Sequence, residues 1–324
     1  MLRTPFCELV GIECPIIQAP IWPAASPALA AAVCNAGGLG TVGAVFGSAE
    51  RVKQHMDQVR ELTDRPFAVN HVVPLLDEDA FATTLEAKPA VVSMSLGQPG
   101  DLTARVHDAG AKVIHQVHTV QQAIEAVEQG VDALIAQGIE AGGQGMALGV
   151  ATMVLIPQIV DAVGSIPVLG AGGIADGRGL AAVLALGGQG VNMGTRFVAS
   201  QEAAASEAWQ QEVIKARSED LVRFEEWQEL FPWSEGTGYP ATPRVLRSAF
   251  VEKWRGRQEA VKQNASELRE EIMEAARKHQ LDKLLPFAGQ TAGMIRDVVP
   301  AETIVRGIVA EAEQALTKAA ELAS

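Results

Sequence analysis

Short apolar runs, rich in β-branched residues, alternate along the first two thirds of the chain with stretches whose apolar residues recur at helical spacing. Eight of the short runs have the pattern of strands buried on both faces of a parallel sheet, and they cover residues 15–18, 39–43, 67–70, 91–95, 112–117, 133–137, 166–171 and 190–194. Helical patterns lie between them at 27–37, 49–62, 79–87, 101–109, 120–129, 152–163 and 177–187, with Ser48 and Thr119 placed as N-caps. Strands and helices in this alternation predict an α/β protein with a (β/α)₈ (TIM) barrel. An open flavodoxin-like sheet would use only about five of the strands.

The region 205–285 breaks this alternation. It is charged, contains Trp209, Trp227, Trp233 and Trp254, has a turn-forming centre at 231–240, and continues with a helical pattern over 244–278. We therefore predict a barrel formed by 1–204 and 286–324, with a small helical subdomain, 205–285, inserted after strand eight. We expect the tryptophans to belong to a core or an interface rather than to a cofactor stack. The Ala- and Glu-rich tail, 303–323, predicts a closing helix.

Composition and charge narrow the class of protein. Hydrophobic residues make up 48% of the chain and charged residues 20%, which is typical of a globular protein and not of a disordered chain. The net charge of −13 argues against a nucleic acid or an anionic membrane as partner, because both require clustered basic residues. No apolar run approaches the ~20 residues of a membrane helix. Cys7, Cys14 and Cys34 lack metal-ligand spacing, so we expect reduced thiols, no metal site and a cytoplasmic location.

Two consecutive joints between a strand and a helix are rich in glycine. One is Pro167–Gly177, which contains Ala171, Gly172 and Gly173, and the other is Gly190–Arg196, which contains Gly194 and Thr195. Glycine allows the main chain to approach an anion closely, and the start of a helix directs free N–H groups toward it. The strand count places these joints after strands seven and eight, where barrel enzymes bind phosphate.

Polar and small residues also follow other strands at the ends where barrel enzymes carry their chemistry. These clusters are 18–22, Asn70–His71, the glycine-rich 137–145 and a late small-residue turn at 288–293. The ordered series resembles the nitronate monooxygenase family, formerly called 2-nitropropane dioxygenases. The resemblance rests on 15–20 (PIIQAP), 35–40 (NAGGLG), 65–70 (RPFAVN), 137–143, 171–174 (AGGI), 192–197 (NMGTRF), 244–247 (RVLR) and 288–290 (AGQ). The family depends on FMN and is related to flavin-dependent enoyl-acyl-carrier-protein reductases and to some flavin NAD(P)H:quinone reductases.

The resemblance implies a bed for FMN. Gln18, Ala19 and Pro20 would lie beside the isoalloxazine ring, Asn70 would hydrogen-bond its polar edge, and Gln137 and Gly138 would line the ring and the ribityl chain. The phosphate would be held by Ala171, Gly172, Gly173, Gly194 and Thr195. Gln290 would close over the flavin, and Gly142 and Gly143 belong to the same cofactor-binding set.

One residue departs from the family pattern, which has Ala-Gly-Gly-His where this chain has Ala141–Gln144. The histidine is taken to be the catalytic base. Glutamine keeps a hydrogen-bonding amide but accepts no proton near neutral pH. A neutral nitroalkane must lose a carbon proton before it is oxidised, whereas a nitronate has already lost it. We therefore expect oxidation of small alkyl nitronates with O2 to be retained or weakened, and oxidation of nitroalkanes to be largely lost.

Several alternatives stay open at this point. His71 either replaces the missing histidine or is a rim residue without a role. Gln144 either contacts the substrate or marks a decayed site. His118 is expected to be structural and His115 stays open, while Glu140 is expected to accept hydrogen bonds from neighbouring N–H groups.

The function itself has two alternatives. One is an NAD(P)H-dependent flavin reductase that acts on an enoyl thioester or a quinone, and the other is an FMN-binding protein that has lost turnover. The expected partners are a small-molecule substrate and O2, with NAD(P)H in the reductase alternative, and a homodimer stays open.

Overall fold

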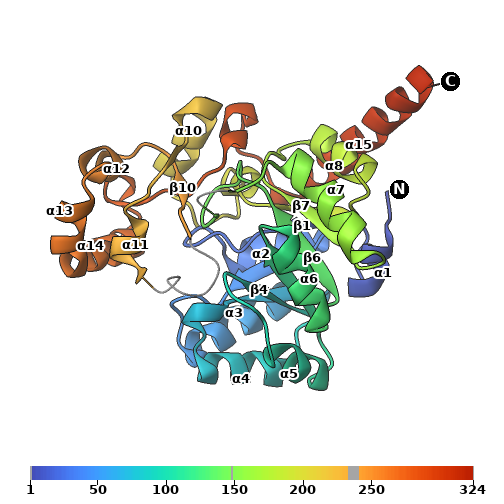
Figure 1. Ribbon diagram of the computed structural model, residues 1–324, viewed down its shortest axis with the longest axis horizontal. Coiled ribbons are helices and arrows are strands. Elements are labelled where there is room, and N and C mark those ends of the chain that lie inside the picture. The colour runs from blue at the N-terminus through green and yellow to red at the C-terminus, as the bar shows by residue number, and fades with distance from the viewer. Residues whose placement is uncertain (1, 147–148, 233–240, 324) are drawn as a thin grey trace.

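Eight parallel strands form a barrel in this computed structural model, which describes residues 2–146, 149–232 and 241–323 (Figure 1). The strands are β1 Ile16–Gln18, β2 Gly40–Gly43, β3 Phe67–Val72, β4 Val91–Ser95, β5 Lys112–Val117, β6 Ala133–Gln137, β7 Val168–Ala171 and β8 Gly190–Met193. They pair in the order β1-β8-β7-β6-β5-β4-β3-β2. Leu39 closes the ring beside β1, since its N–H donates to Ile16 O at 2.9 Å and its carbonyl accepts from Gln18 N at 3.0 Å. The predicted (β/α)₈ barrel is confirmed.

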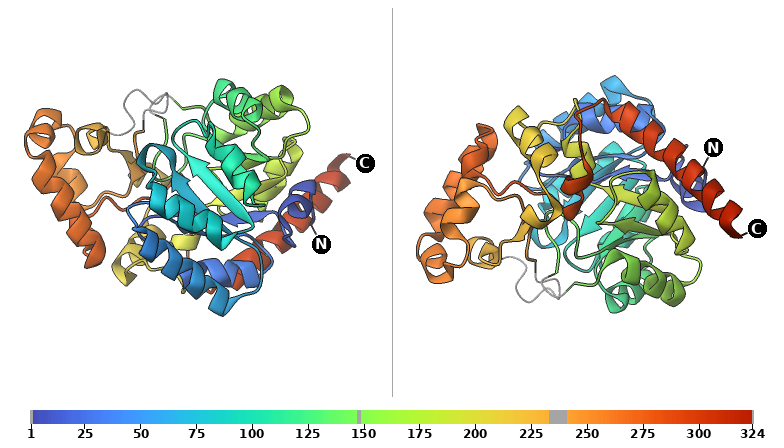
Figure 2. Two further views of the ribbon diagram at one scale, coloured as in Figure 1. Left: turned by 90° about the horizontal axis from the view of Figure 1, so that it is seen from below. Right: turned by 90° about the horizontal axis from the view of Figure 1, so that it is seen from above.

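The helices between the strands cover the outside of the barrel (Figure 2). They are α2 Pro27–Asn35, α3 Ala49–Leu62, α4 Glu78–Ala87, α5 Leu102–Asp108, α6 Val120–Glu128, α7 Thr152–Val163 and α8 Gly177–Ala185, with α1 Pro5–Val10 before β1, the short α9 Thr195–Val198 after β8, and the 3₁₀ turn η1 Val73–Leu75. Ser48 and Thr119 cap their helices as predicted, because their hydroxyls accept from Arg51 N and Gln122 N. No helix of the described residues is long and apolar enough to cross a membrane.

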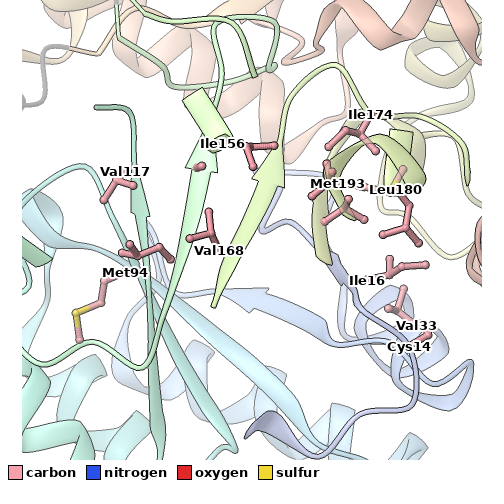
Figure 3. Close-up of a cluster of buried hydrophobic side chains, with 14 of the residues drawn as sticks. Cys14, Ile16, Val33, Met94, Val117, Ile156, Val168, Ile174, Leu180 and Met193 are labelled. Atoms are coloured by element: carbon pink, nitrogen blue, oxygen red, sulfur yellow. The ribbon is translucent and has the colours of Figure 1, made fainter. Parts of the chain in front are cut away.

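Alternation along each strand divides the core into two layers. One set of side chains, including Ile17, Ile114 and Leu169, fills the inside of the barrel. The other set, including Ile16 and Val168, packs against the surrounding helices (Figure 3). Most strands therefore bury apolar side chains on both faces, which explains why they read as largely apolar runs in the sequence.

The region after β8 carries a second apolar cluster. Its elements are α10 Glu207–Lys215, the 3₁₀ turn η2 Ser218–Asp220, β9 Val222–Arg223, α11 Trp227–Leu230, β10 Arg244–Val245, α12 Ala249–Trp254, α13 Gln258–Gln263, α14 Ala265–Arg277 and η4 Leu281–Lys283. Phe224, Trp227, Leu268 and Ile272 are among the residues of this cluster, and α11 to α14 stand to one side of the barrel (Figures 1 and 2).

The secondary structure of this region is mostly helical, as expected. In addition, β9 and β10 form an antiparallel pair that the sequence did not predict. Trp209 and Trp227 are buried, in agreement with the expected core role. Trp233 and most of the turn at 231–240 lie outside the described residues. The domain boundaries at 204/205 and 285/286 stay predictions.

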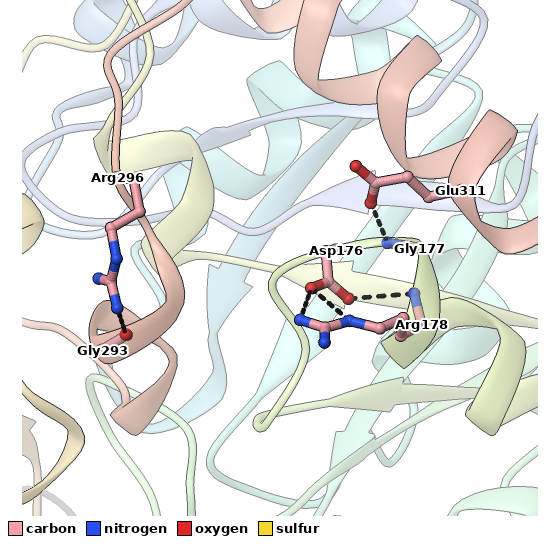
Figure 4. A network of polar contacts seen from close by, with 6 residues as sticks. All are labelled: Asp176, Gly177, Arg178, Gly293, Arg296 and Glu311. Atoms are coloured by element: carbon pink, nitrogen blue, oxygen red, sulfur yellow. Dashed lines mark hydrogen bonds and ion pairs between the residues drawn. The ribbon is translucent and has the colours of Figure 1, made fainter. Parts of the chain in front are cut away.

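The chain ends in the turn η5 Gln290–Met294 and the long helix α15 Ala301–Ala323, in agreement with the predicted closing helix. Gly177, the first residue of α8, lies directly against α15 (Figure 4), and its N–H donates to Glu311 Oε2 at 2.9 Å. A Cβ atom on Gly177 would lie 2.3 Å from Ala312 N. The contact between the two helices therefore requires glycine at this position.

His71 lies on the helix-facing side of β3, because Asn70 and Val72 face the other way. Its Nε2 is 3.0 Å from Thr84 Oγ1 of α4, and its ring packs edge-on against Phe81. The Thr84 hydroxyl donates to Ala80 O, so Nε2 carries the ring proton of a neutral imidazole. Burial lowers the pKa of His71 to about 4.

His115 and His118 are also fully buried. Burial lowers the pKa of His115 to about 3 and the pKa of His118 to about 4. His118 Nδ1 lies 3.4 Å from the carbonyl oxygen of Gln137, in agreement with the structural role expected for it.

These three histidines predict loss of stability in mild acid. Their folded-state pKa values lie below the ordinary value, so protons bind preferentially to the unfolded chain and stability falls as the pH drops from about 6.5 toward 4. Each histidine should lower the free energy of unfolding by about 2 kcal/mol between pH 7 and pH 5. Urea unfolding at the two pH values measures this. His71→Gln should remove about one third of this difference. Equal pH dependence in wild type and His71→Gln would contradict the assignment.

The contact between α8 and α15 predicts opposite effects of two glycine substitutions. Gly177→Ala should lower the free energy of unfolding by more than about 2 kcal/mol, because the added methyl group overlaps backbone atoms. Gly307→Ala, within α15, meets no atom within 4 Å and should raise it by about 0.5–1 kcal/mol. Chemical denaturation of both variants measures the difference, and a stable Gly177→Ala protein would show that α15 does not pack as described.

Candidate functional site

A cavity opens at the carboxyl ends of the barrel strands. Its wall includes residues that end or follow seven of the strands, together with Trp227, Phe287, Gly289 and Thr291 from the later part of the chain. A cavity formed at the carboxyl-end rim of a barrel is a typical binding site for a cofactor and its substrate.

Most residues that the sequence assigned to the site meet at this cavity. Those in its wall are Ala19, Pro20, Asn70, Gln137, Gly142, Gly143, Gln144, Ala171, Gly172, Gly194 and Thr195. They come from six separate segments, so the barrel brings together what the sequence shows only as an ordered series.

Five expected residues are not in the wall: Gln18, His71, Gly138, Gly173 and Gln290. Gln18 faces the closing edge of the barrel, where its Oε1 accepts from Thr41 N at 3.0 Å and its amide nitrogen donates to Ala19 O. His71 faces α4 instead, because neighbouring residues of a strand point in opposite directions. The structure therefore does not place an imidazole where the family histidine would be, and no role at the cavity follows for His71.

The other three residues that are not in the cavity wall support the loops around it. A Cβ atom on Gly138 would lie 2.1 Å from Thr152 Oγ1, so this position requires glycine for packing. Gly173 has φ +73° and faces Glu140. Gln290 donates its backbone N–H to Glu140 O at 3.0 Å. Direct contacts of Gly138, Gly173 and Gln290 with a cofactor stay predictions.

Carboxamide groups from four strands lie along the cavity: Asn70, Gln116, Gln137 and Asn192. Asn70 Nδ2 donates to Ser93 Oγ at 3.0 Å, and Gln137 Nε2 donates to Gln144 O at 2.6 Å. Asn192 Oδ1 is buried without a hydrogen-bond partner among the described residues. An amide set with an unsatisfied acceptor suits a planar ligand with alternating donors and acceptors on its edge.

The two glycine-rich joints form a cradle after β7 and β8. Gly172 has φ +92°, which favours glycine, and a Cβ atom there would lie 2.9 Å from Ala141 N. A Cβ atom on Gly194 would lie no closer than 3.5 Å to the neighbouring Ile21, so the backbone at Gly194 borders the open cavity. Thr195 Oγ1 accepts from Gly289 N at 2.9 Å and keeps its own proton for a ligand. These features fit a bound phosphate.

The loop that carries Gln144 is held by contacts at Gly142 and at Glu140. A Cβ atom on Gly142 would lie 2.4 Å from Ala288 C, so the backbones of the two loops touch. Glu140 accepts from Thr152 N and from Thr152 Oγ1, the latter at 2.9 Å, which confirms the expected structural role of this carboxylate. Gln144 therefore lines the cavity from a rigid loop, and its Oε1 is buried without a hydrogen-bond partner among the described residues.

Two arginines from the later part of the chain hold the same loop. Arg244 donates to Ile139 O at 3.0 Å and to Leu221 O at 3.1 Å, and Arg223 donates to Gly145 O at 3.3 Å and to Met146 O. Burial lowers the pKa of both guanidinium groups, and the charge of Arg244 lowers the pKa of Arg223 further. Sequence reasoning missed Arg223, because nothing in its neighbourhood distinguishes it from a surface arginine.

Aromatic rings form another part of the site, of which the sequence indicated only Trp22, within the cluster 18–22. Trp22, Phe46, Trp227 and Phe287 line the cavity, and Phe231 joins them from behind; we call these five rings the aromatic wall. Successive ring centroids are 5.5 Å (Trp22–Phe46), 6.3 Å (Phe46–Phe231), 4.3 Å (Phe231–Trp227) and 5.9 Å (Trp227–Phe287) apart. Trp22 and Phe46 each follow the carboxyl end of a predicted strand. This position is the feature of the sequence that indicates a place at the site.

The cavity is electrically neutral as far as its wall is described. None of its described lining residues carries a carboxylate, an imidazole, an amine or a guanidinium group. The groups that can act on a ligand there are amides, hydroxyls, backbone N–H groups and aromatic faces.

Comparison with known proteins agrees with this geometry. A family model described as nitronate monooxygenase matches residues 3–85 and 77–311. A protein named as a probable nitronate monooxygenase of Staphylococcus aureus (strain JH9) is 35% identical over 260 residues, covering 66% of this chain and 73% of that protein.

Solved structures extend the likeness over the whole chain. FabK from Thermotoga maritima superimposes with a TM-score of 0.88 at 34% identity, covering 99% of this chain and 100% of that one. A nitroalkane oxidase from Streptomyces ansochromogenes superimposes with a TM-score of 0.82 at 26% identity, covering 97% and 99% of the two chains. Because the family model spans both the barrel and the region after it, this chain belongs to the nitronate monooxygenase family and is a flavin-dependent oxidoreductase.

Proposed function

We propose that this protein is an FMN-dependent nitronate monooxygenase that oxidises small alkyl nitronates with O2. The observation that carries the proposal is the position of Gln144 in the wall of a cavity whose described lining contains no titratable side chain. Such a cavity lacks a base for a neutral nitroalkane but needs none for a preformed nitronate.

FMN suits this site better than a flavin without a phosphate. The cradle at Gly172 and Gly194, with the free proton of the Thr195 hydroxyl, supplies donors for a phosphate at the position typical of barrel enzymes. The amides of Asn70, Gln137 and Asn192 supply partners for the polar edge of a flavin ring. A bound FMN provides the redox chemistry, which is the acceptance of electrons from the substrate and their transfer to O2.

Gln144 has one task in this proposal. Its amide nitrogen can donate a hydrogen bond to a nitronate oxygen, and its position is fixed by the contacts of Glu140 and Gly142. A donor held in place before the substrate arrives loses little further freedom on binding. Gln144 therefore orients the nitronate without taking part in a proton transfer.

A second candidate function is an NAD(P)H-dependent flavin reductase acting on an enoyl thioester or a quinone. It is favoured by the apolar part of the cavity wall, which includes Val72, Leu75 and Leu96 and suits the apolar body of a larger substrate. An FMN-binding protein without turnover is the third candidate, and the anaerobic experiment below separates all three.

Nitronates should reduce the bound flavin at least about 10²-fold faster than the parent nitroalkanes, since a missing general base typically lowers a rate by ~10²–10⁴. Anaerobic mixing, followed through the flavin absorbance, measures both rates. Equal rates with both substrates would contradict the proposed role of Gln144. Fast bleaching by NADH or NADPH alone would assign the protein to the reductases, and no bleaching by any donor would leave a binding protein.

Two variants of Gln144 are matched for this experiment. Gln144→His should raise the rate with nitroalkanes, with a rate that increases as the pH passes through the titration range of histidine. Gln144→Asn keeps an amide and provides no base, so it should not gain nitroalkane oxidation. A gain in both variants would show that proton abstraction is not what limits the wild type.

Gly194→Ala should weaken FMN binding at least about tenfold and affect riboflavin less, because the added methyl group enters the cradle assigned to the phosphate. The substituted side chain meets only ordinary contacts, so the variant should fold. Fluorescence titration of the apoprotein with FMN and with riboflavin measures both affinities, with Gly307→Ala as the control. An unchanged preference for FMN over riboflavin would place the phosphate elsewhere.

A further inference from the structure

The inside of the barrel changes from apolar to polar toward the carboxyl ends of its strands. Side chains that point inward form an apolar layer and, nearer the cavity at the strand ends, a polar layer; we call that cavity the main cavity. The apolar layer includes Ile17, Leu39, Ala68, Ile114 and Ile135, and the polar layer includes Thr41, Asn70, Ser93, Gln116, Gln137 and Asn192. Because a buried polar group costs free energy unless it is hydrogen-bonded, each member of the polar layer needs a partner.

A second, smaller cavity lies between these two layers, and we call it the inner cavity. Its wall includes the five apolar residues together with Thr41, Ser93 and three of the amides. Pro20, Asn70, Gln116 and Asn192 belong to the walls of both cavities, so they separate the inner cavity from the main cavity. The inner cavity has room for about one water molecule. Cavities that stay empty are apolar, whereas this one has polar groups on one side.

Two side chains of the inner cavity carry buried polar atoms that lack a hydrogen-bond partner among the described residues. They are Thr41 Oγ1 and Asn192 Oδ1, and the two residues are 1% and 5% exposed. Asn70 differs, because its Nδ2 donates to Ser93 Oγ at 3.0 Å and to Ser93 O at 3.3 Å. Buried polar groups without a protein partner are typically bound to ordered water. Since both unpartnered atoms belong to one small cavity, a single bridging molecule can satisfy them.

We propose that the inner cavity binds one ordered water molecule, which accepts from the Thr41 hydroxyl and donates to Asn192 Oδ1. Ser93 Oγ accepts from Asn70 and keeps its own proton, so it is a further donor to this water. Three hydrogen bonds are typical of a buried water. Water suits the site because it both donates and accepts, and because no described residue of the wall carries a charge that would compensate an ion.

The water makes Thr41 a positioning residue for the cofactor. Asn192 is one of the amides proposed to hydrogen-bond the flavin edge, and a water bound to its Oδ1 leaves the amide nitrogen for the main cavity. Thr41 is not in the wall of the main cavity, and its backbone N–H donates to Gln18 Oε1 at 3.0 Å, so it acts on the cofactor only through Asn192. The water site rests on the barrel interior alone, whereas its effect on FMN rests on the proposed function.

A crystal structure at a resolution that shows ordered waters tests the site directly. We expect density for one water within hydrogen-bond distance of Thr41 Oγ1 and Asn192 Oδ1, both with and without bound FMN. Thr41→Val keeps nearly the same shape and removes the hydroxyl, so its structure should lack this density. An inner cavity without water in the wild type, a direct hydrogen bond between the two side chains, or water retained in Thr41→Val would overturn the inference.

Loss of the water should also weaken FMN binding through Asn192. Thr41→Val should raise the Kd for FMN about fivefold, as expected for the loss of one hydrogen bond, and it should change the absorbance spectrum of the bound flavin. Thr41→Ser keeps the hydroxyl and should match the wild type in both measurements. Thr41→Val with wild-type affinity and spectrum would overturn the positioning role.

Thr103→Val is the matched control for Thr41→Val. Thr103 Oγ1 is also buried without a hydrogen-bond partner among the described residues, but Thr103 lies in α5 and in neither cavity wall. Removal of this hydroxyl should therefore leave the Kd for FMN and the flavin spectrum unchanged. An equal effect of both variants would show that the loss of any buried hydroxyl weakens FMN binding, and it would overturn the positioning role of Thr41.

The crystal structure and the reduction experiment together separate this inference from the proposed function. If the water is present and no nitronate reduces the flavin, the water site holds and the proposed function fails. If nitronates reduce the flavin and the inner cavity of the wild type contains no water, the proposed function holds and the inference fails.

Discussion

Closure of the barrel at β1 is the constraint on which the site depends. β1 has only three residues, and its two edges must pair with β8 and with the backbone at Leu39. Glycines permit this approach: a Cβ atom on Gly190 would lie 2.7 Å from Pro15 O, and one on Gly38 would lie 2.8 Å from Ile16 O. Because all eight strands are parallel, closure brings their carboxyl ends to a single rim. The amides, the glycine cradle and the Gln144 loop meet only for that reason.

The parts of the site that the sequence predicted are those fixed by the backbone. Strands, the glycines after β7 and β8, and the order of the motifs follow from local patterns, and Gly172, Gly194 and Asn70 lie in the cavity wall, while their contacts with a cofactor stay predictions. The sequence left the direction of the His71 side chain open. Successive side chains of a strand point to opposite faces, so His71 faces away from the cavity because Asn70 faces it. Contacts across long sequence distances, such as Arg223 with Gly145 O, leave no local pattern from which they could be predicted.

Residues of the region between β8 and η5 both form its apolar core and line the cavity. Trp227 is 3% exposed and belongs to the apolar cluster around Phe224 and Leu268, yet it also lines the cavity. β10 lies beside the Gln144 loop, since Arg244 and Gly143 exchange two backbone hydrogen bonds, at 3.0 and 3.1 Å. The core of this region therefore stabilises both the aromatic wall and the Gln144 loop. A substitution that loosens this core would disturb the site without touching a ligand.

A neutral cavity that binds an anion needs a source of positive potential behind its wall. The Gln144 loop has two such sources, because Arg223 and Arg244 donate to the carbonyls of Gly145 and Ile139 on either side of Gln144. A guanidinium group that bonds carbonyl oxygens keeps its full charge, and partial burial reduces its screening by solvent. Under the proposed function, these two charges would favour an anionic nitronate at Gln144, even though the chain as a whole carries a net charge of −13.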